Sequence, residues 1–327
     1  MLRSLSIESF RGIRRGELAD LPRLALLTGP NGSGKSTVLE AIQVAAGTWP
    51  AESIGRVVRR RAEVANGPRW LLHRGDLQSR PKLTAQWADG SIRHTKLWVN
   101  GLQVGAKVRL GDGAEQGTTT LFRWQQGHHE YDAPENIEAA RRAPFLRFLD
   151  QRIGSARSSL NAVYSESVLR SPVAFLEVLQ RLDPGIRDLR ILEEEGWPSQ
   201  LHLIYDDRSV PVGLAGDGVE SLVRLALELT VRDGGTFLVE EPEAHQHLAA
   251  VCGTARVLVA AARSNCQLIV TTHSLDLLDA ILFELTPAER SLLAVYRTRL
   301  QQGELHVRRV GGDDVTTART EIGEDLR

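Results

Sequence analysis

The feature that most constrains this chain is a glycine-rich loop between an apolar run and an amphipathic helix. The run 24–27 (LALL) predicts a buried strand, and the residues after Thr37 have apolar side chains at helical spacing. Between them the sequence matches the pattern G-x-x-x-x-G-K-[ST], which is formed by Gly29, Pro30, Asn31, Gly32, Ser33, Gly34, Lys35 and Ser36. A strand, such a loop and a helix in this order are typical of a phosphate-binding loop, so the sequence predicts a nucleoside triphosphate site.

The residue types of this loop fit the chemistry of a triphosphate. Glycine lets backbone N–H groups turn toward phosphate oxygens where a Cβ would obstruct them, and the N-terminus of the next helix adds partial positive charge. We expect Lys35 to reach the β- and γ-phosphates, Ser36 to ligate Mg²⁺ and Thr37 to extend the anion-facing turn. The alternative is an accidental glycine loop, and the flanking strand and helix argue against it.

Composition places the chain among ordinary globular proteins. Of its 327 residues, 42% are hydrophobic and 25% are charged, and the net charge of −1 gives no overall attraction to nucleic acid or to a membrane. Contact with DNA would need a local patch; the basic segment 56–61 is a candidate, with a solvated helix face as the alternative. The sequence shows no signal peptide and no apolar run of about 18 residues, so we expect a cytoplasmic protein without membrane contact.

The first half of the chain reads mainly as antiparallel β-structure around the loop. Residues 1–22 alternate apolar and polar positions, which indicates one or two antiparallel strands that feed the loop strand. From 49 to 133, short alternating runs lie between Gly and Asp turns and predict an antiparallel insertion. The clearest of these runs are 82–87, 91–99 and 107–110.

The second half is predicted to be helical at first and then α/β. Helical spacing is carried by Ile137, Phe145, Phe148 and Leu149, and a second helix is expected at 172–182. The elements expected after it are two strands within 188–212, helix 218–232, strand 236–239, helix 247–262, strand 267–270, helix 274–285 and strands near 292–298 and 304–310. We therefore expect one ATPase domain, 1–327, with a nucleotide-binding core (1–48 and 186–327), an antiparallel β insertion (49–133) and a helical lobe (134–185).

Two later strands are predicted to end in polar side chains that complete the site. The apolar strand at 236–239 is followed by Glu240 and Glu241; one carboxylate at a strand end can hold Mg²⁺ and the next can polarise the attacking water. We assign Glu240 to the metal and Glu241 to the general base. The strand at 267–270 is followed by His273, which could bond the γ-phosphate or the attacking water. The alternatives are an acidic strand end and a structural histidine.

Two further stretches leave alternatives open. A glycine-bearing loop with Gly216, Asp217 and Gly218 precedes a predicted helix and forms a second anion-ready helix N-terminus, or simply a helix cap. Because it is far from Lys35 in the sequence, it could serve a phosphate bound to another subunit. Carboxylate and imidazole groups also gather in EEPEAHQH (240–247), where a zinc site is conceivable but the first carboxylates already have a magnesium role.

Taken together, these motifs resemble the ABC-type ATPase heads of the RecF/SMC-like group. The resemblance is strongest to the OLD (overcoming lysogenisation defect) branch and its stand-alone relatives. It rests on FRGI (10–13), GPNGSGKSTVLEAI (29–42), DPGIRDL (183–189), AGDGVESL (215–222), FLVEEPEAHQH (237–247) and TTHS (271–274). It implies the fold class of a P-loop NTPase with an ABC-ATPase-like head, an antiparallel β subdomain and an inserted helical lobe.

The resemblance also implies ligands and roles. It implies ATP rather than GTP, Mg²⁺, and a head-to-tail homodimer in which two nucleotides are held between the subunits. The loop of Gly216, Asp217 and Gly218 from one subunit would cap the γ-phosphate held by the other. By the same resemblance Glu241 is the base, His273 is the switch residue, and Arg11 lies near the adenine. One departure is that Ala215 or Gly216 stands where the signature serine of ABC heads would fall.

The stretch after His273 (274–327) is too short for the Toprim nuclease domain of an OLD nuclease, so the resemblance implies the stand-alone form. Such relatives often act with a separately encoded effector, and the leading hypothesis is an ATPase that gates a nuclease in phage defence or DNA processing. A slow ATP-dependent clamp on DNA or protein, without an effector, is the second hypothesis. A transporter motor and an intrinsic nuclease are disfavoured, because the sequence lacks an LSGGQ-type signature and a second carboxylate cluster.

Overall fold

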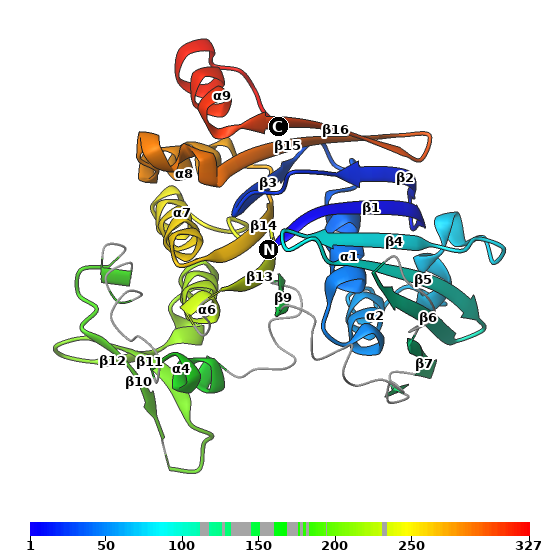
Figure 1. Cartoon of the computed structure of the whole chain (residues 1–327). Helices are drawn as coiled ribbons and strands as arrows, with labels where there is room; N and C mark the ends of the chain where they lie inside the picture. The colour runs from blue at the N-terminus through cyan, green and yellow to red at the C-terminus, as the bar shows by residue number, and fades with distance from the viewer. Residues whose placement is uncertain are drawn as a thin grey trace.

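The computed structural model describes residues 1–111, 118–125, 128–131, 145–150, 160–168, 176, 179–180, 183–193, 195–230 and 234–327. One large sheet organises this part of the chain (Figure 1). Its strands are β1 Leu2–Phe10, β2 Ile13–Leu18, β3 Leu24–Thr28, β4 Lys82–Trp87, β5 Ile92–Asn100, β6 Gln103–Leu110, β7 Thr118–Gln125, β8 His128–Tyr131, β9 Leu146–Asp150, β13 Gly235–Glu240, β14 Cys266–Thr271, β15 Leu293–Gln301 and β16 Glu304–Gly311. Within the described residues their order is β8-β7-β6-β5-β4-β1-β2-β16-β15-β3-β14-β13-β9.

The half of the sheet around β3 is parallel and is covered on both faces. β3 pairs in parallel with β14 on one side and with β15 on the other, and all five of its residues are buried. Leu24 and Leu26 belong to the core that contains helices α6 (Asp217–Thr230), α7 (Leu248–Arg263) and α8 (Leu275–Glu284). Ala25 and Leu27 pack toward α1 (Lys35–Ala46) and α2 (Pro50–Arg59) on the opposite face (Figure 1). A continuous apolar run is what a strand between two helical layers requires.

The other half of the sheet is antiparallel. β1 and β2 form the expected antiparallel pair, and β1 also pairs with β4, so that β4 to β8 continue the same sheet. The alternating runs predicted at 82–87, 91–99 and 107–110 are strands β4, β5 and the end of β6. This confirms the antiparallel pattern; the division of the chain into core and insertion stays an interpretation, because the hydrogen bonding is continuous between the two.

The predicted helical lobe needs one correction. Residues 146–150 form β9, which pairs in parallel with β13 at the edge of the sheet, so the helical assignment of Phe148 and Leu149 is wrong. A short apolar run does not distinguish a helix from a strand, and pairing with β13 decides between them. Helix α4 (Leu160–Val168) is present, whereas the helix predicted around Ile137 lies outside the described residues and that at 172–182 lies largely outside them.

The later elements follow the predicted order. The observed α6, β13, α7, β14, α8, β15 and β16 lie within a few residues of the ranges expected from 218 to 310. Two strands are predicted within 188–212, and the structure adds a third: β10 (Asp188–Leu192), β11 (Gln200–Ile204) and the short β12 (Ser209–Pro211) form a small separate sheet that leads into α6.

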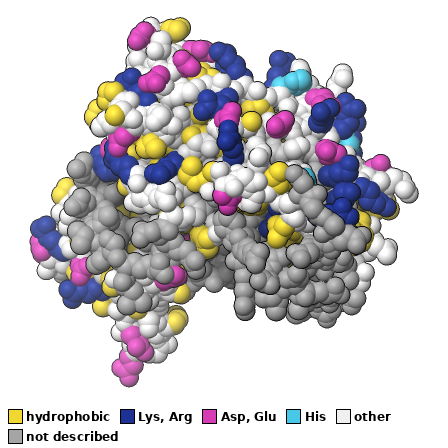
Figure 2. Space-filling view, viewed as in Figure 1, with side chains coloured by type: hydrophobic (Ala, Val, Ile, Leu, Met, Phe, Trp, Pro, Cys, Tyr) yellow, Lys and Arg dark blue, Asp and Glu magenta, His cyan; other side chains and the backbone are white. Residues whose placement is uncertain are grey.

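The last residues return to the strand before the loop. After α9 (Gly312–Thr317), the buried Leu326 accepts a hydrogen bond at its carbonyl from Thr28 Oγ1, at 2.6 Å. Among the described helices, none is both long enough and apolar enough to cross a lipid bilayer. Over the described part of the face shown in Figure 2, basic and acidic side chains are interspersed.

Stability is expected to depend on the central parallel strands. Ile269 of β14 is 0% exposed and lies in the core beneath α1, whereas Ile322 is 71% exposed. Ile269→Ala should lower the free energy of unfolding by about 2–5 kcal/mol, because it leaves a cavity between sheet and helix. Ile322→Ala should change it by less than about 0.5 kcal/mol. Urea denaturation of both variants measures this, and similar losses would contradict the packing described here.

Candidate functional site

The glycine-rich loop leaves β3 and turns into α1 in a conformation that depends on glycine, as Gly29 and Gly34 show. Gly29 has φ of 139°, and a Cβ there would lie 2.4 Å from the carbonyl oxygen of Thr298. Gly34, which precedes α1, has φ of 95°. Both values lie in the region that side chains disfavour, so the loop depends on these glycines. Next to Gly29, the hydroxyls of the buried Ser33 and of Thr298 are hydrogen-bonded to each other at 2.9 Å. This bond fixes the loop to β15.

Lys35 is the first residue of α1, and its side chain lies across the loop. Its Nζ donates to the carbonyl oxygens of Gly29, at 2.7 Å, and Pro30, at 3.1 Å. Burial lowers the pKa of Lys35, and the charges of Glu241 and Glu240 act in the opposite direction. Ser36 and Thr37 follow in the first turn of α1 and are half-buried, while Asn31 and Gly32 are exposed at the tip of the loop.

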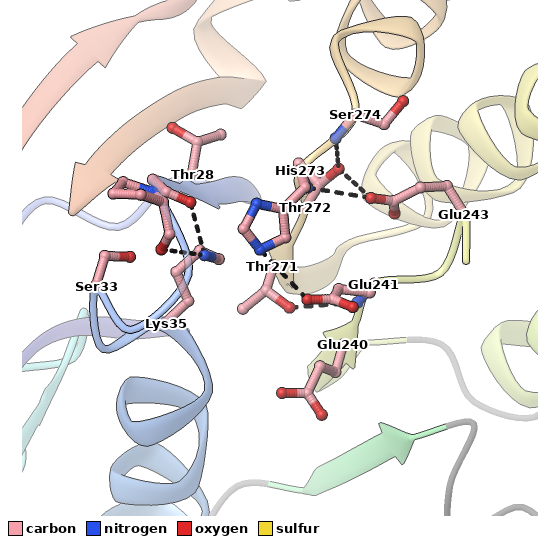
Figure 3. Close-up of polar contacts among 12 residues, drawn as sticks. Thr28, Ser33, Lys35, Glu240, Glu241, Glu243, Thr271, Thr272, His273 and Ser274 are labelled. Atoms are coloured by element: carbon pink, nitrogen blue, oxygen red, sulfur yellow. Dashed lines mark hydrogen bonds and ion pairs between the residues drawn. The ribbon is translucent and has the colours of Figure 1, made fainter. Parts of the chain in front are cut away.

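The two predicted carboxylates lie at the end of β13, but their surroundings differ. Glu241 has φ of 43° and its backbone N–H donates to the carbonyl and the hydroxyl oxygens of Thr271 on β14. This unfavourable backbone angle, held by two bonds, directs the carboxylate toward His273, whose Nε2 lies 3.5 Å from Glu241 Oε1 (Figure 3). Glu240 is the last residue of β13, and its Oε2 accepts a hydrogen bond from Arg60.

His273 is held by a half-buried carboxylate that the sequence analysis did not assign to the site. Glu243 Oε1 accepts hydrogen bonds from the Thr272 hydroxyl and from the backbone N–H of His273, the latter at 3.2 Å (Figure 3). Burial raises the pKa of Glu243, against the effect of these bonds. Burial also lowers the pKa of His273, and the positive charge of Lys35 lowers it further while Glu241 raises it. The imidazole is therefore mostly neutral at pH 7.

The structure thus brings Lys35, Glu241 and His273 together at one edge of the sheet, with Glu240 beside them. The glycine loop predicted as a second anion site lies elsewhere: Gly216 and Asp217 are exposed at the start of α6. Gly218 is backed by the residues that follow β13, because a Cβ there would lie 3.5 Å from the carbonyl oxygen of His245.

Two other candidates from the sequence are Arg11 and the stretch 240–247. Arg11, predicted near the adenine, is turned inward: its Nε lies 2.6 Å from Glu40 Oε2, and its side chain is 12% exposed. Its place beside the adenine stays a prediction. No group of three or more His, Cys, Asp or Glu side chains that could hold a metal ion occurs in the described part of the chain, which includes the stretch 240–247 considered for zinc.

Sequence reasoning missed three residues of this region. Glu243 could have been found from its spacing after the carboxylate pair, but its partners become visible only when β14 lies beside β13. Asp150 ends β9 in register with Glu240, a position that the helical assignment concealed. Arg60 was seen only as part of a basic segment, and its contact with Glu240 joins residues that are 180 positions apart.

The geometry fits a magnesium nucleotide. The loop offers backbone N–H groups and a lysine ammonium, which suit phosphate oxygens, and the space beside Gly32 is open, since a Cβ there would meet no atom within 4 Å. The donor set of a Ser36 hydroxyl and a Glu240 carboxylate is of the oxygen type that Mg²⁺ prefers. Fold and site together define a P-loop ATPase of the ABC type.

Comparison with known proteins agrees with this class. A family model described as "AAA domain, putative AbiEii toxin, Type IV TA system" matches residues 106–279, more than half of the chain, so the chain belongs to this family. A second model, described as "AAA domain", matches residues 4–68, which include the glycine-rich loop. The protein is an ATPase.

Individual relatives match in part or in fold. The DNA replication and repair protein RecF of Magnetococcus marinus is 34% identical over 110 residues, which are 33% of this chain and only 27% of that protein. A crystal structure of an SMC head bound to the C-terminal winged-helix domain of ScpA has a TM-score of 0.64 at 14% identity, covering 95% of this chain and 97% of that one. An SMC head bound to the C-terminal domain of ScpA from Pyrococcus furiosus has a TM-score of 0.59 at 12% identity, covering 99% of each chain. At these identities the two structures establish a shared fold.

The charge of Lys35 should be measurable at His273. Because burial and Lys35 both lower the pKa of His273, its imidazole should titrate below its ordinary value of about 6.5. Lys35→Met removes a positive charge and should raise that pKa. Lys82→Met, which alters a surface lysine paired with Glu8, should leave it unchanged. NMR titration of labelled imidazoles, with the His273 signal assigned from the His273→Asn variant, measures this pKa. A His273 pKa that is the same in Lys35→Met as in the parent would contradict the geometry.

Proposed function

We propose that this protein binds ATP with Mg²⁺ at the glycine-rich loop, hydrolyses it, dimerises on ATP and thereby gates a separate effector protein. The observation that carries the proposal is the convergence of Lys35, Glu241 and His273 from three different segments on the carboxyl edge of the parallel strands. Stability of the fold does not require a cation, a carboxylate and an imidazole to lie together beside a phosphate-type loop. All three side chains are polar groups that folding alone would leave in water.

The phosphate chain would be held by the loop. Backbone N–H groups of the residues from Gly29 to Thr37, other than Pro30, which has none, would donate to phosphate oxygens, as the positive end of α1 favours. Lys35 Nζ now donates to two neutral carbonyls, and charged phosphate oxygens are stronger acceptors for the same ammonium. The lysine would therefore turn from the loop carbonyls to the β- and γ-phosphates.

The metal would be held by Ser36 Oγ and Glu240. When bound there, Mg²⁺ would neutralise charge on the β- and γ-phosphates. Glu241 would accept a proton from the attacking water, and His273, whose Nε2 lies 3.5 Å from Glu241 Oε1, would bond that water or the γ-phosphate. Glu243 keeps the backbone of His273 in position through the 3.2 Å bond to its N–H.

Dimerisation is proposed from the second glycine loop. Gly216, Asp217 and Gly218 open α6 at the surface, next to Leu214, which is 78% exposed. A second subunit arranged head to tail could receive this helix N-terminus at its own γ-phosphate, through backbone N–H groups because the signature serine is missing.

The effector is proposed to be a nuclease, in phage defence or DNA processing in the cytoplasm, in the manner of stand-alone OLD relatives. The description of the family as a putative AbiEii toxin favours a defence role, and the partial match to RecF favours DNA processing. A slow ATP-dependent clamp on DNA or protein is the second candidate, favoured by SMC heads that are described as bound to a ScpA domain. ATP turnover with and without DNA, and with and without a co-purifying partner, distinguishes the two.

Glu241→Gln tests the base. The variant should bind ATP as the parent does but hydrolyse it about 10²–10⁴-fold more slowly, because the amide does not accept the proton of the attacking water. Lys35→Ala should lose ATP binding itself, and Glu321→Gln, at an exposed position, should alter neither. Isothermal titration and phosphate release measure the two quantities. A Glu241→Gln protein that hydrolyses ATP at the parent rate would show that the base is another residue.

Leu214→Asp tests the dimer surface. In the Glu241→Gln background with ATP we expect a dimer by sedimentation velocity, and adding Leu214→Asp should shift it to monomer while ATP affinity stays. The control is Ile322→Asp, another exposed apolar position, which should remain dimeric. A Glu241→Gln protein that stays monomeric with ATP at high concentration would reject the dimer.

A further inference from the structure

Arg60 occupies a buried place between the loop helix and the strand that carries the two carboxylates. It lies directly after α2, and its side chain is only 5% exposed. One end of the guanidinium, Nη1, lies 3.2 Å from Glu40 Oε1 on α1, while Nη2 donates to Glu240 Oε2 at the end of β13. Its Cζ lies 4.3 Å from the centre of the Phe148 ring of β9. Neither reading of the basic segment, a solvated face or a nucleic-acid contact, describes this side chain.

The two carboxylates depend on Arg60 to different degrees. Glu40 is 0% exposed and has other cations close by, since Arg11 Nε lies at 2.6 Å and Arg61 Nε at 3.5 Å. Glu240, whose side chain is 12% exposed, forms an ion pair with Arg60 within the described part of the chain. The charge of Lys35 interacts with Glu240 only at longer range. Replacing Arg60 is therefore expected to change the charge environment of Glu240 more than that of Glu40.

The rest of the segment shows that this inward position is specific to Arg60. Arg56, one turn earlier on the same helix, pairs with Glu52 four residues before it, and both side chains are more than one-third exposed. That pair is an ordinary surface contact within a helix. Arg56 thus offers a matched control, because it has the same side chain on the same helix without contact to Glu240.

From this geometry, and resting on the magnesium site of the proposed function, we propose that Arg60 is an internal counter-cation that competes with Mg²⁺ for Glu240. Arg60 is bonded to Oε2 of Glu240, and a divalent cation on the other oxygen of this half-buried carboxylate would lie within a few ångströms of the guanidinium, so the two cations would repel each other strongly. Without nucleotide, Arg60 neutralises Glu240; when the magnesium nucleotide binds, the guanidinium leaves Glu240 and stays with Glu40. Because Arg60 terminates α2, nucleotide binding is transmitted to that helix.

The competition predicts the direction of a measurable change. Arg60→Gln should lower the Mg²⁺ concentration that half-saturates the Mg²⁺-dependent gain in ATP affinity by about tenfold, the scale on which partners of a metal ligand alter metal affinity. ATP affinity measured in EDTA should be unchanged, because the phosphate loop is untouched. Arg60→Lys keeps a charge but loses the two-pronged contact, so it should shift the midpoint in the same direction by less. Arg56→Gln should match the parent.

The measurement is isothermal titration with ATP at a series of free Mg²⁺ concentrations, in the Glu241→Gln background so that no turnover occurs. An unchanged or higher Mg²⁺ midpoint in Arg60→Gln would overturn the inference, since an arginine that merely orients Glu240 would strengthen metal binding. If Arg60→Gln does not fold, as judged by circular dichroism, the sign of the shift in Arg60→Lys decides in its place.

Glu240→Gln separates this inference from the proposed function. If Glu240→Gln keeps the parent dependence on Mg²⁺, the assignment of Glu240 to the metal is wrong, and the proposed function must be revised at that point. If Glu240→Gln loses the dependence while Arg60→Gln does not shift it downward, the magnesium site stands and only the counter-cation role of Arg60 fails.

Discussion

The parallel pairing of β3, β14 and β13 is the constraint on which the site depends. Parallel strands end at the same edge, so the loop after β3, the residues after β14 and the carboxylates after β13 are delivered to one place, although the loop lies more than 200 residues before the other two segments. The strands stay in register because their side chains are buried on both faces, between α1 on one side and α7 on the other. The position of the site is thus determined by the packing of apolar side chains, none of which belongs to the site itself.

Behind this edge lies a layer of buried charge. Arg11, Arg60 and Arg61 surround the fully buried Glu40 of α1, and Arg60 continues to Glu240. Buried charges are tolerated only with partners, so a change at one member is felt by the others. The loop helix, α2 and β13 are therefore coupled by electrostatics as well as by packing. Glu243 has a similar part on the other side of the site, where it joins the segment after β13 to the segment after β14.

The relatives share this architecture more than they share sequence. SMC heads cover nearly the whole chain at 14% identity or less, which shows that many sequences satisfy the same sheet and helical layers. The match to RecF extends over 33% of the chain. Fold alone does not define what an ATPase of this type controls.

The sequence by itself determined the glycine-rich loop, the antiparallel runs and the later strand–helix order, because each rests on the spacing of neighbouring residues and on local backbone requirements such as that of Gly29. Only the tertiary structure decided that residues 146–150 are a strand, since the choice rests on pairing with β13. It alone also gave Arg60 and Glu243 their partners, which lie 180 and about 30 positions away. Contacts between residues so far apart in the sequence produce no periodic pattern in it. They form when packing excludes water and each buried charge must lie beside an opposite charge.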